Sequence, residues 1–143
     1  MIEVRLFDLE PDSFERFTYR GTLFTGKAYE YGSHGNVVAE IMIRDGMQNG
    51  VSREYYDSGV TKCQEVFRNG VLHGEAREWY ESGRTKTVGS YEYGICTALR
   101  EYDEEGALVR DYKLTEGDAQ YDLLELYRRS EPPSRWEDDE YAP

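Results

Sequence analysis

The chain has 143 residues, which is enough for one domain with a modest hydrophobic core. Its 29 Asp and Glu residues exceed its 17 Lys and Arg residues, so the formal net charge is −12, which disfavours nucleic acid and anionic membranes and favours basic partners. The 13 tyrosines and 2 tryptophans argue against disorder throughout, and no apolar run approaches the roughly 18 residues of a transmembrane helix.

Residues 1–20 precede the repeated part of the chain and are expected to cap it with one or more strands. Ile2, Val4 and Leu6 alternate with polar residues, a pattern that predicts a strand. Acidic residues interrupt this segment where a signal peptide needs an unbroken apolar stretch. We therefore expect a cytoplasmic protein.

Residues 21–117 contain four copies of one pattern. The copies are Gly26–Gly35, Gly50–Gly59 and Gly74–Gly83, which start 24 residues apart, and the shorter Ala98–Gly106. Eleven residues after each closing glycine comes another, at Gly46, Gly70, Gly94 and Gly117. Such regular spacing predicts an array in which each unit is stabilised mainly by its neighbours.

Each unit is predicted to be a β-hairpin. A strand of about six residues leads to a turn, where Ser-Gly and Asn-Gly pairs tolerate positive φ, and a return strand follows. The return strands are predicted at 37–43, 61–67, 85–91 and 108–114. No helix-length segment fits between the glycines, which excludes a parallel sheet with crossovers. The fold class is therefore mainly β, an elongated antiparallel meander of 24-residue hairpin repeats.

Alternation along the strands separates two columns of side chains. One column is aromatic in every copy and is expected to form the core: Tyr31, Tyr55, Trp79 and Tyr102. The other column, with a glutamate in every copy, is expected to be a free surface. Its residues are the predicted partner-binding set: Glu30, Glu54, Tyr56, Glu78, Tyr80, Glu101 and Asp103.

The last part of the chain differs from the array. Residues 118–130 are predicted to form a capping helix, with Asp118 at its start and apolar residues at three- and four-residue steps. Terminal units of arrays need such caps to protect open sheet edges. Beyond Pro132-Pro133, residues 131–143 form an acidic tail that is expected to be mobile.

No catalytic constellation is visible. His34 and His73 fall at or beside turns without a fixed neighbour suited to a triad, and Cys63 and Cys96 are expected to be free thiols in a reducing compartment. Glutamates in one column would stand about 10 Å apart, too far to share a proton directly. We therefore predict no enzyme, no metal site and no cofactor.

The units resemble the membrane occupation and recognition nexus (MORN) repeat, most closely its bacterial variant. The resemblance covers about residues 21–114 and lies in the aromatic and glycine spacing of Tyr55-Tyr56-Asp-Ser-Gly59, Asn69-Gly70-Val-Leu-His-Gly74 and Trp79-Tyr80-Glu-Ser-Gly83. Two units depart from it, because Gly32 and Asp103 stand where the second aromatic is expected.

This resemblance implies a function in protein binding. The bacterial variant occurs in antitoxins and immunity proteins, which neutralise a cognate toxin by binding it. Many such toxins act on nucleic acid and carry a basic cleft, so an acidic, tyrosine-bearing sheet face is expected to bind a basic toxin such as a nuclease or deaminase.

Two alternatives differ in class. A scaffold or self-associating module would pair chains through an open sheet edge. Phospholipid binding, which the family name suggests, is disfavoured because the sequence shows no basic patch and no exposed apolar helix.

Overall fold

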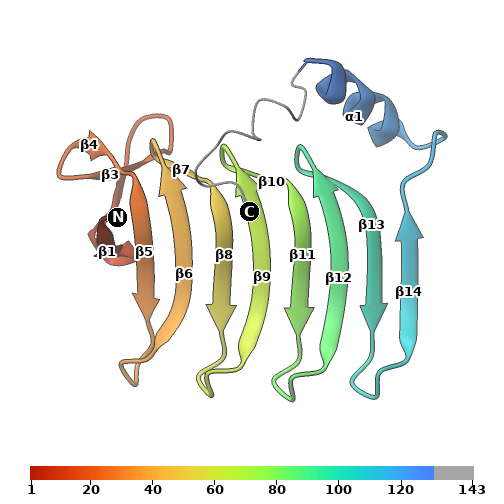
Figure 1. The fold of residues 1–143 in the computed structure, drawn as a ribbon, viewed down its shortest axis with the longest axis horizontal. Helices are drawn as coiled ribbons and strands as arrows, with labels where there is room; N and C mark the ends of the chain where they lie inside the picture. Colours follow the sequence, from red (N-terminus) through yellow and green to blue (C-terminus); the bar gives the residue numbers. More distant parts are fainter. Residues whose placement is uncertain (131–143) are drawn as a thin grey trace.

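The computed structural model describes residues 1–130, so the predicted acidic tail at 131–143 lies outside the described residues. The fold class is confirmed: a long, mainly antiparallel meander with one helix at its C-terminal end (Figure 1). The sheet order is β1-β5-β6-β8-β9-β11-β12-β13-β14, with β7 beside β6 and β10 beside β9.

The hairpin strands follow the predicted repeat closely. They are β5 (Gly26–Tyr31), β6 (Val37–Arg44), β8 (Gly50–Tyr55), β9 (Thr61–Arg68), β11 (Gly74–Trp79), β12 (Thr85–Glu92), β13 (Ile95–Tyr102) and β14 (Leu108–Lys113). The short strands β7 (Met47–Gln48) and β10 (Val71–Leu72) extend the hairpins at the upper edge in Figure 1.

At this upper edge, two-residue turns join neighbouring units. Both residues of each turn have positive φ: 49° and 79° at Asp45-Gly46, 47° and 84° at Asn69-Gly70, and 52° and 80° at Tyr93-Gly94. Such turns match the twist of the flanking strands. Because they need positive φ, the second residue of each turn is a glycine.

Side chains from the preceding unit hold these turns in place. The backbone N–H of Asp45 donates to Thr25 Oγ1 at 2.9 Å. One unit later Asn69 N–H donates to Asn49 Oδ1 at 3.3 Å, and two units later Tyr93 N–H donates to His73 Nδ1 at 2.9 Å. The acceptors Thr25, Asn49 and His73 are 24 residues apart, so the repeat includes a side-chain tie between units.

The lower edge has its own ties. A β-bulge ends the first strand of each hairpin, for example between Glu54 and Tyr55, and the next residue begins the turn. In the turn, Tyr56 donates its hydroxyl to the carbonyl oxygen of Trp79 at 2.8 Å, and Tyr80 does the same to Tyr102 at 2.9 Å. Units are therefore joined at both edges as well as along the strands.

The prediction that the aromatic column forms the core is wrong. Tyr55, Trp79 and Tyr102 are only half-buried and Tyr31 is 50% exposed, because within residues 1–130 the middle of the sheet is a single layer with no second layer over this column. The buried apolar clusters lie at the two ends instead: Leu9, Phe24, Ala28 and Ile43 at the N-terminal end, and Ile95, Leu114 and Leu124 at the C-terminal end.

The N-terminal segment builds the first of these ends. Strand β1 (Glu3–Arg5) pairs in parallel with β5, and the 3-10 helix η1 (Leu6–Asp8) follows it. A small separate sheet then forms from β2 (Glu10–Pro11), β3 (Phe17–Tyr19) and β4 (Thr22–Leu23). The parallel pairing is a departure from the meander, which the sequence pattern did not predict.

Helix α1 (Ala119–Ser130), close to its predicted bounds, packs at the upper corner of the other end and leaves the edge of β14 open (Figure 1). Leu124 is 1% exposed and packs in the cluster with Ile95 and Leu114. Arg128 forms a bidentate ion pair with Glu92 of β12, in which Nε donates to Oε1 at 3.0 Å and Nη2 donates to Oε2 at 2.6 Å. This pair links the helix to the sheet. Within residues 1–130, no helix is both long and apolar enough to cross a membrane.

Candidate functional site

Four predicted glutamates lie in one row across the sheet. Pairing gives the order Glu30, Ala39, Glu54, Cys63, Glu78, Thr87 and Glu101, each residue opposite the next on the neighbouring strand. Residues opposite each other share a face, so the glutamates point to the same side, two strands or about 10 Å apart. Glu30, Glu54, Glu78 and Glu101 are thus brought together as predicted.

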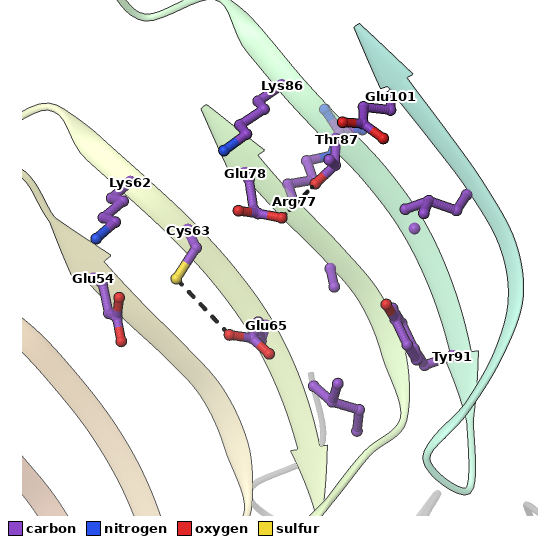
Figure 2. Close-up of a pocket in the computed structure, with 14 residues that line it drawn as sticks. Glu54, Lys62, Cys63, Glu65, Arg77, Glu78, Lys86, Thr87, Tyr91 and Glu101 are labelled. Carbon is purple, nitrogen blue, oxygen red and sulfur yellow. Dashed lines mark hydrogen bonds between the residues drawn. The ribbon is translucent and has the colours of Figure 1, made fainter. Parts of the chain in front are cut away.

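This side of the sheet is hollowed. A depression of about 600 Å³ is lined by Glu54, Glu65, Glu78 and Glu101, together with Cys63 and Tyr91 among others (Figure 2). A second depression of about 350 Å³ is lined by Glu30 and shares Glu54 and Glu65 with the first. The glutamate face, defined as Glu30, Glu54, Glu65, Glu78 and Glu101, therefore extends from β5 to β13.

Glu65 was missed by the sequence analysis because it stands on a return strand, outside the repeated column. It lies opposite Ser52 and between the strands that carry Glu54 and Glu78. Burial raises the pKa of Glu65, and repulsion from the carboxylates of Glu54 and Glu78 raises it further. Alternation along β9 was the available signal, since it places Glu65 on the same side as Cys63.

Cys63 lies in the middle of this face. Its Sγ donates to Glu65 Oε1 at 3.8 Å. Burial, followed by the negative charges of Glu54 and Glu65, raises the pKa of the thiol to about 12. The thiol is therefore protonated at neutral pH, and it is a poor nucleophile because the thiolate is the reactive form.

The carboxylates of the glutamate face have no ion-pair partner among residues 1–130. Two of these carboxylates accept hydrogen bonds from neutral groups: Thr87 Oγ1 donates to Glu78 at 3.0 Å, and Cys63 donates to Glu65. Like charges about 10 Å apart on a hollow surface create a negative potential that attracts cations, although Lys62 and Lys86 also line the depression.

The opposite side of the sheet is arranged differently. There Glu40 is paired with Lys27 and Arg53, each at 3.4 Å, and accepts the hydroxyl of Tyr55 at 2.8 Å. Burial opposes ionisation of Glu40, but these donors outweigh it and lower its pKa. Glu40 therefore differs from the carboxylates of the glutamate face in having two cationic partners.

The other three predicted residues lie in the lower turns. Tyr56 and Tyr80 are half-buried and bond the next unit, as described above. Asp103 accepts the backbone N–H groups of Glu105 and Ala107 at 3.0 and 2.9 Å, which stabilises its turn. These residues therefore have structural roles that their place in the column did not indicate.

Two lysines border the hollow beside the tyrosines. Lys62 Nζ lies 5.8 Å from the ring centre of Tyr56, and Lys86 Nζ lies 5.7 Å from that of Tyr80. Both lysines line the 600 Å³ depression, and Figure 2 shows them near Glu54 and Glu78. The sequence analysis missed them, although they too are 24 residues apart.

Within residues 1–130, no group of three or more His, Cys, Asp and Glu side chains is arranged to hold a metal ion. His73 lies at the upper edge, bonded to Tyr93, and His34 lies in a lower turn beside Ser33. The features of the glutamate face that the structure does show are its row of carboxylates and its hollow shape.

The chain matches no protein-family model and no curated protein. Among solved structures, it is similar to one described as the crystal structure of accessory secretory protein 1, 2 and 3 in Streptococcus pneumoniae. The likeness has 16% identity and a TM-score of 0.38, and it covers 80% of this chain and 20% of that chain. A likeness of this size carries no argument about function.

Proposed function

We propose that this protein is a binding inhibitor of the antitoxin or immunity type, and that its glutamate face binds a cognate basic protein toxin. The MORN-like repeat of the sequence suggests the class, and the net charge of −12 suits a basic partner. A nuclease or deaminase toxin fits this chemistry, because its substrate-binding cleft must attract phosphate.

One observation carries the proposal: the carboxylates on the two sides of the sheet have different surroundings. Glu40 lies beside two cations and accepts a hydroxyl, whereas Glu65 accepts the Cys63 thiol and is repelled by the carboxylates of Glu54 and Glu78. A sheet that serves only as a scaffold has no need of such repulsion. Lysine or arginine side chains of a partner would relieve it, and that relief would contribute to the free energy of binding.

The size of the face favours a macromolecule over a small ligand. The row of glutamates runs across seven paired strands, from Glu30 on β5 to Glu101 on β13. At about 4.8 Å per strand, this row is roughly 29 Å long, which is the scale of a protein–protein interface.

The test compares two triple variants with the same change in charge. Glu54→Gln/Glu78→Gln/Glu101→Gln removes three charges from the face, and Glu81→Gln/Glu104→Gln/Glu105→Gln removes three from exposed turn positions. The probe is the protein encoded by the adjacent gene, because an inhibitor is normally made beside its target. Calorimetry measures binding, and co-expression measures protection from that protein's toxicity.

The face variant is expected to bind at least about tenfold more weakly, and more so at low salt, while the turn variant stays within about threefold of the unmodified chain. Equal losses in both variants would show that only net charge matters. Absence of binding by the unmodified chain would reject the inhibitor role for that gene pair.

A second candidate, self-association, has its own observation. Strand β14 is the last in the sheet order, and its residues Leu108 and Val109 are 51% and 59% exposed. Open edges of this kind readily pair with another strand. Light scattering of the purified chain distinguishes the candidates: a stable dimer that Val109→Lys disperses supports self-association, and a monomer supports the inhibitor.

A further inference from the structure

The three side-chain ties at the upper edge differ in one chemical respect. Thr25 and Asn49 accept hydrogen bonds from the turn N–H groups through oxygen atoms that do not change protonation state across the physiological pH range. At the third position, His73 accepts with Nδ1, and a ring nitrogen accepts only while it carries no proton. Only the last tie of the series can therefore be broken by acid.

The turn that His73 holds is also a contact point for helix α1. The rings of His73 and Tyr93 meet edge to face, with centres 4.9 Å apart. On its other side, Tyr93 stacks with Tyr127 of α1, with ring centres 5.6 Å apart and an angle of 25°. Tyr93 also packs against the cluster that contains Leu124. A change at His73 is thus two ring contacts away from the helix.

We infer that neutral His73 fastens the Tyr93-Gly94 turn, and that its protonation in mild acid loosens this turn together with helix α1. Protonation replaces the acceptor with a second N–H donor, which faces the N–H of Tyr93 and breaks the hydrogen bond between them. The backbone of Tyr93 is in the left-handed region, at φ 52°, so the turn depends on outside support.

The charged groups around His73 have opposite effects on its pKa. Burial lowers the pKa of His73 most, the cation Arg68 of β9 lowers it further, and the carboxylate Glu92 of β12 opposes both. Glu92 is itself paired with Arg128 of α1, which also binds Glu125. The net result is a lowered pKa.

The sign of the pH effect follows from this direction. The pKa of His73 is lower in the folded chain than in the unfolded one. The stability that neutral His73 contributes is therefore complete above about pH 6.5, which corresponds to the ordinary pKa of histidine. It is lost as the pH falls through the lower, folded value.

Hydrogen exchange of the full chain, followed by mass spectrometry at about pH 7.5 and pH 5.0, tests the inference, with rates divided by the intrinsic rate at each pH. The matched control is His73→Asn, because Asn49 fills the same place one unit earlier. In the unmodified chain, residues 91–96 and 119–130 are expected to exchange about fivefold faster in acid than at neutral pH, the cost of about one hydrogen bond.

In His73→Asn this acid-dependent increase should be absent, while the neutral-pH rates stay close to those of the unmodified chain. Equal acid responses in both chains would overturn the inference.

A second measurement does not depend on folding of that variant. His34→Gln leaves one histidine, and its ¹⁵N spectrum at neutral pH should show the proton on Nε2. A proton on Nδ1 would also overturn the inference.

Discussion

The hydroxyl of Tyr56 donates a hydrogen bond of 2.8 Å to the carbonyl oxygen of Trp79, which lies in the next unit. Tyr56→Phe removes this bond and leaves a half-buried carbonyl without that donor, so we expect a loss of about 1 kcal/mol in the free energy of unfolding. Chemical denaturation measures it. Tyr31→Phe is the control, since Tyr31 is 50% exposed, and should change the stability by less than about 0.5 kcal/mol.

The glutamate face predicts a gain in stability from loss of charge. Because the pKa of Glu65 is raised, its ionised form destabilises the fold above that pKa, and this cost disappears as the pH falls through the folded value. Glu65→Gln should therefore raise the denaturation midpoint at about pH 7, and the gain should shrink towards pH 4. Glu40→Gln should do the opposite, because Glu40 has a lowered pKa and three donors. A loss of stability in Glu65→Gln at neutral pH would contradict the account of the face.

The glycines at the upper edge are not equivalent. Gly74 has φ 132°, and a Cβ there would lie 3.0 Å from Cβ of Val66. Gly74→Ala should cost about 2 kcal/mol or more, from backbone strain and overpacking. Gly117 has no atom within 4 Å of such a Cβ, so Gly117→Ala is expected to be neutral within about 0.5 kcal/mol. Thermal unfolding of both variants gives the comparison, and equal costs would mean that the crowding at Gly74 is irrelevant.

Helix α1 should depend on one buried side chain. Leu124→Ala removes a side chain that is 1% exposed and packed on Ile95 and Leu114, so we expect a loss of about 3 kcal/mol. Leu126→Ala changes a side chain of the same kind that is 52% exposed, and it should cost less than about 1 kcal/mol. Circular dichroism during urea titration measures both, and similar costs would show that the helix does not depend on the Leu124 contact.

Much of the fold was predictable because the information is local and periodic. A glycine after an Asp, Asn or Tyr at positive φ specifies a two-residue turn, and this occurs at Gly46, Gly70 and Gly94. Spacing between turns then sets strand length and pairing, so the return strands begin where they were predicted. The row of glutamates follows in turn, because alternation needs no knowledge of distant contacts.

The failures share a cause as well. Whether the column of Tyr55 and Trp79 becomes a core depends on a second layer over it, and periodicity within one layer does not report whether that layer exists. The bulge before Tyr55 moved Tyr56 out of the strand and into the turn, where its hydroxyl serves the next unit. Glu65, Lys62 and Lys86 join the hollow only through register between strands.

By itself, then, the sequence determined a repeating hairpin, its length, its turns and a ladder of acidic side chains, since each follows from neighbours close in the chain. The tertiary structure alone decided that Glu40 lies beside Lys27 while Glu65 lies near other carboxylates, and that His73 supports a turn whose Tyr93 packs against helix α1. Those relationships join residues from different units, and they depend on which strands meet and what packs against them.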